Sequence, residues 1–185
     1  PSSRLKERMD YYIAPEEPET DFLRIASPEE IKVCDPACGS GHMLTYAFDL
    51  LYAIYEEEGH ETTEIPGLIL KHNLTGVEID DRAGALAAFA LTMKAAAKLG
   101  RRRFLRMDVK PDVVVLQNIA FAPAEMQDVA AMVGRDLFTS EMRETLAQFE
   151  QSKNFGSLNV PKLRDPAETP RVVEARDLAS DLLPK

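Results

Sequence analysis

Residues Asp35 to Gly41, which read DPACGSG, combine one carboxylate with two glycines in a short run. The apolar residues before Asp35 predict a buried strand, and the apolar spacing after Gly41 predicts a helix. Gly39 and Gly41 let the backbone turn tightly and approach a ligand, because no side chain stands in the way. The free N–H groups at the start of the helix point to the same place. This stretch therefore predicts the floor of a nucleotide-type binding site.

The residues that the loop lacks narrow the choice of ligand. A P-loop requires a lysine followed by serine or threonine after its last glycine, but Gly41 is followed by His42 and Met43. A nicotinamide or flavin site requires a third glycine where Leu44 stands, and Asp35 would repel a pyrophosphate. S-adenosylmethionine fits better, because it carries an ammonium and a sulfonium group but no phosphate.

A second acidic residue completes the expected site. Asp35 offsets the positive charge of the cofactor, and Glu78, in the strand end GVEID, accepts hydrogen bonds from both ribose hydroxyls. Hydrogen bonds to a charged group contribute about 1.5–3 kcal/mol each. Ile79 is expected to lie against the adenine. The cofactor-binding residues expected from this pattern are Asp35, Pro36, Ala37, Cys38, Gly39, Ser40, Gly41, Glu78 and Ile79.

Strands and helices alternate along the chain. Strands are expected at 31–35, 74–80 and 112–118, and helices at 42–58, 65–71, 81–98, 125–133, 139–153 and 172–183. Asp80 or Asp81 is expected to cap the third of these helices. Residues 154–170 are expected to form a long loop. This alternation predicts an α/β fold in which helices cover a parallel sheet, and the sheet is only partial because a doubly wound domain usually has more strands.

Composition limits the partners and the compartment. The net charge of −9 argues against a broad basic surface for nucleic acid. The one concentrated basic patch is RRRFLRMD, where Arg101, Arg102, Arg103 and Arg106 either meet a phosphate backbone or, as we favour, form a solvated loop of like charge. No apolar stretch has the length of a membrane span, and no signal-like segment opens the chain. Cys34 and Cys38 suggest neither a disulfide framework nor a zinc site. We therefore expect a cytoplasmic protein without metal or membrane contact.

DPACGSGHML followed by GVEIDDRAGALAAFAL resembles the cofactor-binding half of the gamma-type adenine-specific DNA methyltransferases. FDLLYAIYEEEG and FGSL are similar to the methyltransferases of BREX phage-defence systems, so that the likeness covers roughly Met9 to Leu158. The resemblance implies a Rossmann-like methyltransferase core with S-adenosylmethionine as cofactor. It also implies methyl transfer to the N6 amine of an adenine flipped out of double-stranded DNA. In this family Asp35 to Gly41 would be the first cofactor motif and Glu78 the ribose-binding acid.

The family's catalytic signature, N-P-P-Y, is absent from the chain. The run NIAF, which begins at Asn118, follows an apolar strand but lacks both prolines. It is either a degenerate catalytic loop or, as we favour, the place where the family offers an Asp or Asn to the adenine of the cofactor. Asp108 is the rival for that contact. The resemblance thus adds Asn118 to the expected cofactor site and leaves the chain without a catalytic residue.

These gaps predict that the chain is a segment of a longer protein. We expect a helical lead-in at 1–30, a partial cofactor-binding core at 31–153, and a loop and helix at 154–185 that lead to the remainder. The catalytic signature is expected beyond Lys185. Double-stranded DNA would be bound through parts outside this chain, other phage-defence subunits are possible partners, and the segment alone would have no turnover. Two alternatives stay open: a methyltransferase acting on RNA or protein, and a non-catalytic scaffold that binds S-adenosylmethionine.

Overall fold

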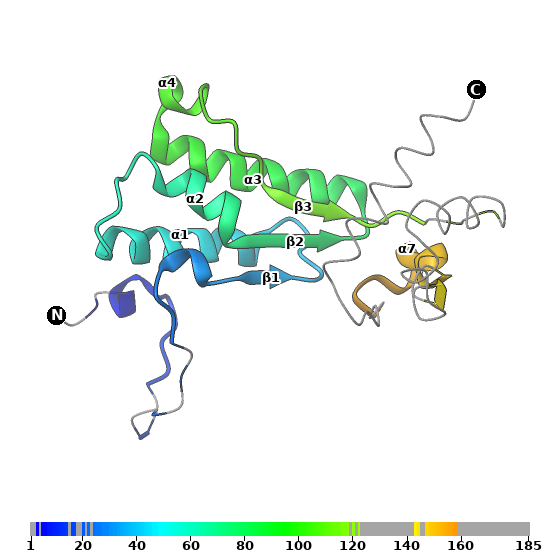
Figure 1. The fold of residues 1–185 in the computed structure, drawn as a ribbon, viewed down its shortest axis with the longest axis horizontal. Helices are drawn as coiled ribbons and strands as arrows, with labels where there is room; N and C mark the ends of the chain where they lie inside the picture. The colour runs from blue at the N-terminus through cyan, green and yellow to red at the C-terminus, as the bar shows by residue number, and fades with distance from the viewer. Residues whose placement is uncertain are drawn as a thin grey trace, which may run out of the picture. The chain divides into compact units, whose positions relative to one another are not determined.

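The computed structural model describes residues 3, 5–14, 16–17, 20, 22, 24–118, 120, 122, 143–144 and 147–158. The chain divides into two compact units, Pro1–Val115 and Leu116–Lys185. The first unit contains a parallel sheet with its helices, and the described part of the second contains short helical turns besides non-helical residues at its start (Figure 1). The expected division at residues 30 and 153 stays a prediction.

Within the described residues, the sheet has three parallel strands in the spatial order β1-β2-β3. They are β1 (Val33–Asp35), β2 (Leu74–Glu78) and β3 (Asp112–Val115). Asp35 lies beside Gly76, and Glu78 lies beside Val115. The three arrows point the same way in Figure 1, so their carboxyl ends share one edge of the sheet. The loops that follow β1 and β2 therefore become neighbours.

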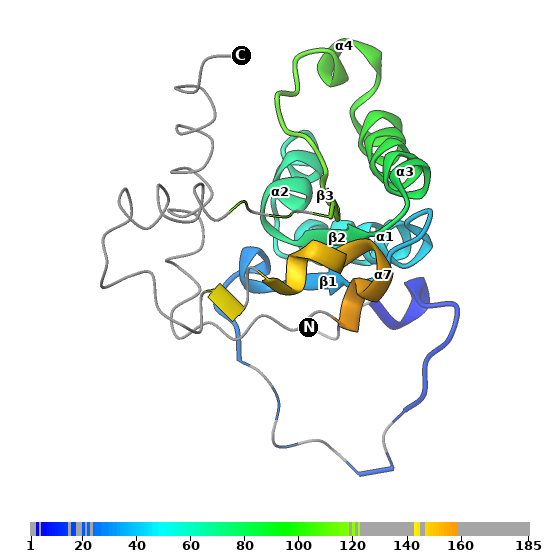
Figure 2. The same ribbon diagram turned by 90° about the vertical axis from the view of Figure 1, so that its right-hand side faces the viewer.

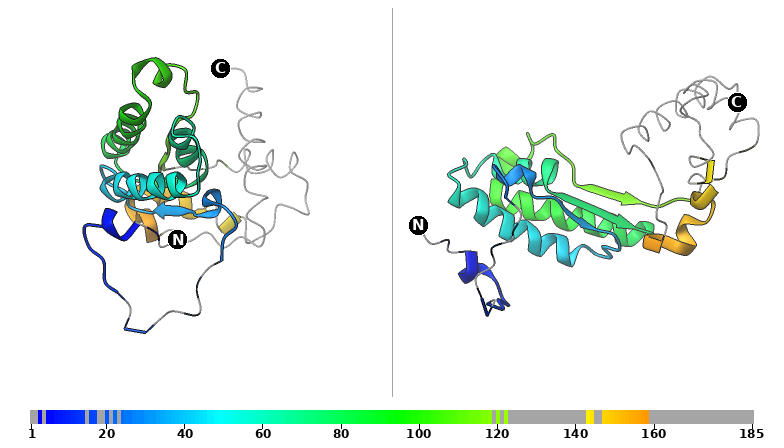
Figure 3. Two further views of the ribbon diagram at one scale, coloured as in Figure 1. Left: turned by 90° about the vertical axis from the view of Figure 1, so that its left-hand side faces the viewer. Right: turned by 60° about the horizontal axis from the view of Figure 1, so that its bottom comes forward.

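The helices follow the strands in the expected order. They are α1 (His42–Glu57), α2 (Ile65–His72), α3 (Asp81–Leu99) and the short α4 (Arg101–Phe104), and the 3-10 turns η1 (Leu5–Arg8) and η2 (Pro28–Glu30) precede β1. Helices α1 and α3 lie side by side against the sheet, as Figures 2 and 3 show. The predicted α/β architecture, a partial parallel sheet flanked by helices, is confirmed.

The core of this unit forms where α1 meets α2, α3 and the sheet. Helix α1 buries apolar side chains three and four positions apart, which places them on one face of the helix. Each such side chain contributes roughly 1.5–3 kcal/mol by leaving water. The fully or nearly fully buried large side chains are Leu44, Phe48, Leu51, Tyr55, Ile65, Ile69, Leu70 and Leu91.

Two glycines allow the layers to approach closely. A Cβ atom on Gly84 in α3 would lie 2.5 Å from Cγ2 of Val115, and one on Gly76 in β2 would lie 2.8 Å from Cδ1 of Leu44. Both distances are too short for real atoms. A larger residue at either position would therefore force the neighbouring side chain to shift, although the backbone of neither glycine has a positive φ.

A buried polar network holds the amino-terminal end of the sheet. The side-chain Nδ2 of Asn73 donates to the carbonyls of Pro28 and Ile31 at 2.7 and 2.8 Å, and the hydroxyl of Tyr55 donates to Oδ1 of Asn73 at 2.9 Å. Burial raises the pKa of Tyr55 to about 12. Asn73 thus connects η2 to α1 and to the start of β2 with its hydrogen-bonding groups satisfied.

The remaining segments either differ from the sequence prediction or lie outside the residues that the structure describes. Arg101–Phe104 forms the helical turn α4 instead of a loop, because the chain closes i to i+4 bonds from Gly100 and Arg101. The start of the expected loop at 154–170 is also helical, since α7 (Ser152–Phe155) and η4 (Gly156–Leu158) follow η3 (Phe149–Gln151). The helices expected at 125–133 and 172–183 lie outside the described residues. Among those described, no helix is both long and apolar enough to span a membrane.

Candidate functional site

The glycine loop leaves β1 at Asp35 and enters α1 at His42. Gly39 and Gly41 have φ angles of 53° and 83°, in the left-handed region that favours glycine. The N–H of Gly41 donates to the carbonyl of Cys38 at 2.8 Å, and the N–H of Cys38 donates to the carbonyl of Val77 at 3.0 Å. The second bond fastens the loop to β2 and brings it to the carboxyl edge of the sheet.

Glu78 connects the glycine loop with the loop that follows β2. Its Oε2 accepts the N–H of Gly39 at 2.6 Å, and its Oε1 accepts the N–H groups of Ile79 and Asp80 at 2.9 and 3.1 Å. These bonds, first that from Asp80, lower the pKa of Glu78 against an opposing effect of burial. Glu78 is therefore held as a carboxylate between the two loops.

Asp35 and Asp80 each organise the backbone that follows them. Oδ1 of Asp35 accepts the N–H of Ala37 at 3.2 Å, which shapes the first turn of the glycine loop. Oδ1 of Asp80 accepts the N–H groups of Arg82 and Ala83 at 2.9 and 3.0 Å, which confirms Asp80 as the cap of α3. The N–H of Ala83 is the first cause of the lowered pKa of Asp80.

The amino terminus of α1 presents uncapped backbone N–H groups. Its N-cap is Gly41, and no side chain accepts a hydrogen bond there. Gly41 also lies against α3, because a Cβ atom at this position would be 3.0 Å from Cβ of Ala87. The free N–H groups and the helix dipole favour a negatively charged group at this point. A ligand carboxylate suits it.

Cys38 differs from the other residues of the loop because its thiol faces the core. The side chain is buried, and a Cβ atom on Gly76 would lie 3.1 Å from its Sγ. Burial raises the pKa of the Cys38 thiol, and the charges of Asp35 and Glu78 raise it further. The thiol of Cys38 therefore packs beneath the loop, and its predicted role in cofactor binding would fall to its backbone.

The residues present fit S-adenosylmethionine. The uncapped start of α1 suits the carboxylate of its amino-acid group, and the carboxylates of Asp35 and Glu78 suit its positive charges and hydroxyls. A Cβ atom on Gly39 would meet no other atom within 4 Å, so the space above the loop is open. Ile79 is 41% exposed beside this loop, as a residue that packs on an adenine requires.

The hydrogen bonds of Glu78 limit how it can hold a ribose. A carboxylate has about four acceptor positions, and three backbone N–H groups already occupy three of them on Glu78. Two ribose hydroxyls can both bind only if one of these N–H groups is released. The expected roles of Asp35, the glycine loop, Glu78 and Ile79 in cofactor binding stay predictions, which this geometry supports.

Asn118 and Asp108 are the two candidates for a contact with the adenine of the cofactor. Asn118 belongs to the second unit, where its Oδ1 accepts the N–H of Lys153 at 2.8 Å, and its expected contact with the cofactor stays a prediction. Asp108 precedes β3 and is exposed at the amino-terminal edge of the sheet. That edge is opposite to the glycine loop, which argues against Asp108 as the rival for this contact.

Comparison with known proteins agrees with this site. The family model described as "MmeI, DNA-methyltransferase domain" matches residues 23–106, which include the glycine loop and Glu78. The chain is 40% identical over 186 aligned residues to the adenine-specific methyltransferase BrxX of Escherichia coli O9:H4 (strain HS), an alignment that covers 85% of this chain and 15% of BrxX. It is 36% identical over 131 residues to the adenine-specific methyltransferase PglX of Lacticaseibacillus casei (strain Zhang), covering 70% of this chain and 10% of PglX. The chain is therefore related to the adenine-specific methyltransferases BrxX and PglX and corresponds to a portion of such a protein, with similarity to the DNA-methyltransferase domain of MmeI.

Proposed function

We propose that this segment binds S-adenosylmethionine within a complete enzyme that methylates adenine in double-stranded DNA. The observation that carries the proposal is the junction between the glycine loop and the acidic end of β2, where Glu78 accepts the N–H of Gly39 at 2.6 Å. The similarity to BrxX and PglX supports adenine as the target. The similarity to the MmeI domain supports DNA.

The described residues would bind the cofactor both through charge and through the shape of the loop. The cofactor supplies an activated methyl group on a sulfonium. Asp35 offsets its positive charge, while the start of α1 binds the carboxylate and the left-handed glycines keep the loop close to the ligand. Glu78 receives the ribose, and Ile79 covers one face of the adenine. Because the loop is bonded to β2 before the ligand arrives, little ordering is required on binding.

The chemistry on adenine belongs to other parts of the complete protein. The chain contains no N-P-P-Y run, which in the resembling family accepts the hydrogens of the target amine. We place that signature and the recognition of the DNA sequence elsewhere in the protein, within a BREX-type phage-defence system. The contact of Asn118 with the adenine of the cofactor, expected from the family resemblance, is part of this proposal.

Cofactor binding is tested by calorimetry on the complete protein. Wild type should release heat with S-adenosylmethionine, and Glu78→Ala should bind it about tenfold or more weakly, because about 1.4 kcal/mol corresponds to a factor of ten. The matched control is Glu64→Ala, which removes an exposed carboxylate at the start of α2 that makes no side-chain cap bond, and this variant should bind normally. Absence of heat with wild type would refute the proposal.

The methyl acceptor is tested with cofactor that carries a radiolabelled methyl group. Duplex DNA, total RNA and a protein mixture are each incubated with the complete enzyme, and the labelled DNA is digested to nucleosides. Label should appear in N6-methyladenine from duplex DNA. Label in RNA or protein would show that the methyl acceptor is not DNA. Absence of label in all three substrates would indicate a scaffold that binds the cofactor without transferring its methyl group.

A further inference from the structure

The basic cluster of Arg101, Arg102, Arg103 and Arg106 lies at the opposite end of the sheet from the glycine loop. It follows α3 and precedes β3, so it belongs to the amino-terminal edge of the strands. In Figure 1, α4 stands at the far end from the arrowheads of β1, β2 and β3. The cofactor site therefore makes no use of these arginines, and their concentration requires another reason.

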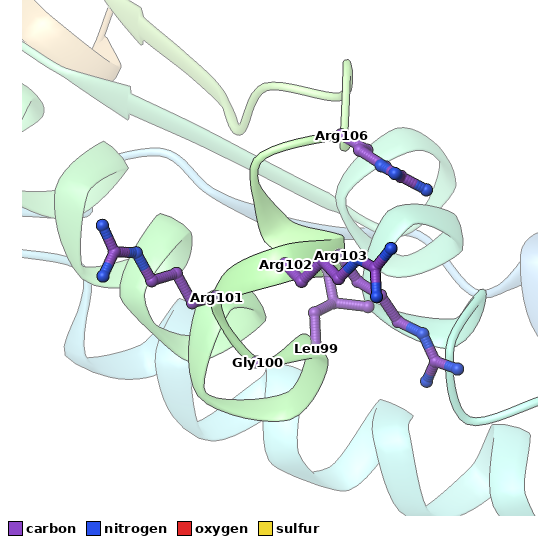
Figure 4. Close-up of a pocket in the computed structure, with 6 residues that line it drawn as sticks. All are labelled: Leu99, Gly100, Arg101, Arg102, Arg103 and Arg106. Carbon is purple, nitrogen blue, oxygen red and sulfur yellow. The ribbon is translucent and has the colours of Figure 1, made fainter.

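The four arginines contribute to the lining of an open hollow beside α4. Its volume is about 530 Å³, and Leu99 and Gly100 complete its lining. All four side chains are exposed. In Figure 4 the guanidinium groups of Arg103 and Arg106 extend to one side of α4, whereas that of Arg101 extends to the opposite side. The cluster thus presents cations around a protruding turn and not toward a single point.

No acidic side chain neutralises this cluster within the part of the chain that the structure describes. The ion pairs found there join Arg82 to Asp80 and Lys94 to Asp49. The neighbouring Lys98 is also engaged, because its Nζ lies 3.9 Å from the centre of the Tyr52 ring. Asp108 is the nearest acid in the sequence, and it forms no ion pair with the cluster. Four unpaired guanidiniums in a chain of net charge −9 mark a local site for an anion.

We propose that Arg101, Arg102, Arg103 and Arg106 form a contact surface for the phosphate backbone of duplex DNA, separate from the end of the domain that binds cofactor. This inference rests on the proposed function, which requires DNA near the domain. Guanidinium forks match phosphate oxygens with two parallel hydrogen bonds. The acidic remainder of the chain repels DNA, so contact is favourable only where positive charge is concentrated.

The arrangement of the arginines favours a polymer over a single small anion. Successive residues of a helix point about 100° apart, so Arg101, Arg102 and Arg103 cannot converge on one phosphate. A nucleic-acid backbone offers phosphates at successive positions and can meet several of these side chains. Such contacts hold the duplex in place without reading its sequence. The surface therefore positions DNA outside the methylation site.

The test measures binding of a duplex made only of G·C pairs to the complete protein at several salt concentrations. Such a duplex contains no adenine, so contacts with a flipped target base are excluded. Arg102→Gln/Arg103→Gln should reduce the slope of log affinity against log salt by about 0.9 for each phosphate that the variant no longer neutralises. It should also weaken binding at about 0.1 M salt by about tenfold or more. The charge-matched control is Arg8→Gln/Arg24→Gln, which removes two exposed arginines outside the cluster and should leave the slope unchanged.

Calorimetry with S-adenosylmethionine on the same variants separates this inference from the proposed function. Both double variants should bind the cofactor like wild type. If cofactor binding is normal and the slope is the same in all proteins, the surface does not contact DNA and only this inference fails. Equal weakening in the two double variants would show a general charge effect, and failure of wild type to bind the G·C duplex would also overturn the proposal.

Discussion

The backbone N–H of Gly39 donates to Oε2 of Glu78 at 2.6 Å, across 39 positions of the sequence. The same carboxylate accepts two further N–H groups from the loop after β2. One side chain thus determines how far apart the two halves of the candidate cofactor site lie. This relationship gives Glu78 a structural role beside its proposed role in binding the ribose, and the two roles can be separated by experiment.

Glu78→Gln should loosen the glycine loop even without cofactor. The amide keeps one oxygen for Ile79 and Asp80 but presents an NH₂ group toward Gly39, and a hydrogen bond to a charged acceptor contributes about 1.5–3 kcal/mol. Hydrogen exchange of the Gly39 amide should therefore become faster in the variant. Glu64→Gln should leave this exchange rate unchanged. Equal protection of the amide in wild type and Glu78→Gln would contradict the role of this bond.

The contribution of Glu78 to the stability of the folded chain should decrease at acid pH. Its pKa is lowered in the folded chain, chiefly by the N–H of Asp80, from an ordinary value of 4.5. The contribution is therefore fully present above pH 4.5 and is lost as the pH falls through the lower folded pKa. Unfolding midpoints measured between neutral and acid pH should fall less steeply for Glu78→Gln than for wild type. Parallel curves would show that the carboxylate contributes nothing.

Gly84→Ala should destabilise the first unit, because the new Cβ would lie 2.5 Å from Cγ2 of Val115. Such overpacking typically costs about 1–3 kcal/mol. Gly67→Ala in α2 is the control, since its Cβ would meet no other atom within 4 Å and its φ is not positive. That substitution should stabilise the helix by about 0.4–1 kcal/mol. Urea denaturation of both variants measures the contrast, and a stabilised Gly84→Ala protein would be inconsistent with this packing.

Gly41→Ala should weaken cofactor binding through both its backbone and its contact with α3. The residue has a φ of 83°, and its Cβ would lie 3.0 Å from Cβ of Ala87. Gly59→Ala isolates the backbone cost, because Gly59 has a φ of 85° and nothing within 4 Å of its Cβ. Calorimetry should show an affinity loss of about tenfold for Gly41→Ala alone. Similar losses in both variants would assign the effect to general destabilisation.

Tyr55→Phe should cost stability, because it leaves Oδ1 of Asn73 buried without its donor. A buried group left unsatisfied costs about 1–3 kcal/mol. The pKa of Tyr55 is raised from an ordinary value of 10.0 to about 12, so its neutral form is favoured in the folded chain. Wild-type stability should therefore decline between pH 10 and about pH 12, whereas Tyr55→Phe should show a smaller decline. Thermal unfolding across this range provides the measurement.

Much of the candidate site could be predicted from local sequence. The glycines of the loop, the acidic end of β2 and the Asp80 cap depend on backbone preferences and helix periodicity, which act over a few residues. The alternation of strands and helices also indicated the parallel sheet. Because these signals are local, the strands and the three longest helices among the described residues lie where the sequence predicts them, with ends that differ by a few residues.

Other features depended on which segments become neighbours in space. The sequence determined a strand, a glycine loop, a helix and an acidic strand end, because each is encoded within a short stretch. Only the tertiary structure decided that Glu78 bonds to Gly39, that Gly84 must be small beside Val115, and that Asp108 and the arginine cluster lie at the edge opposite to the loop. These relationships join distant positions through strand register and helix packing, which local propensities do not specify.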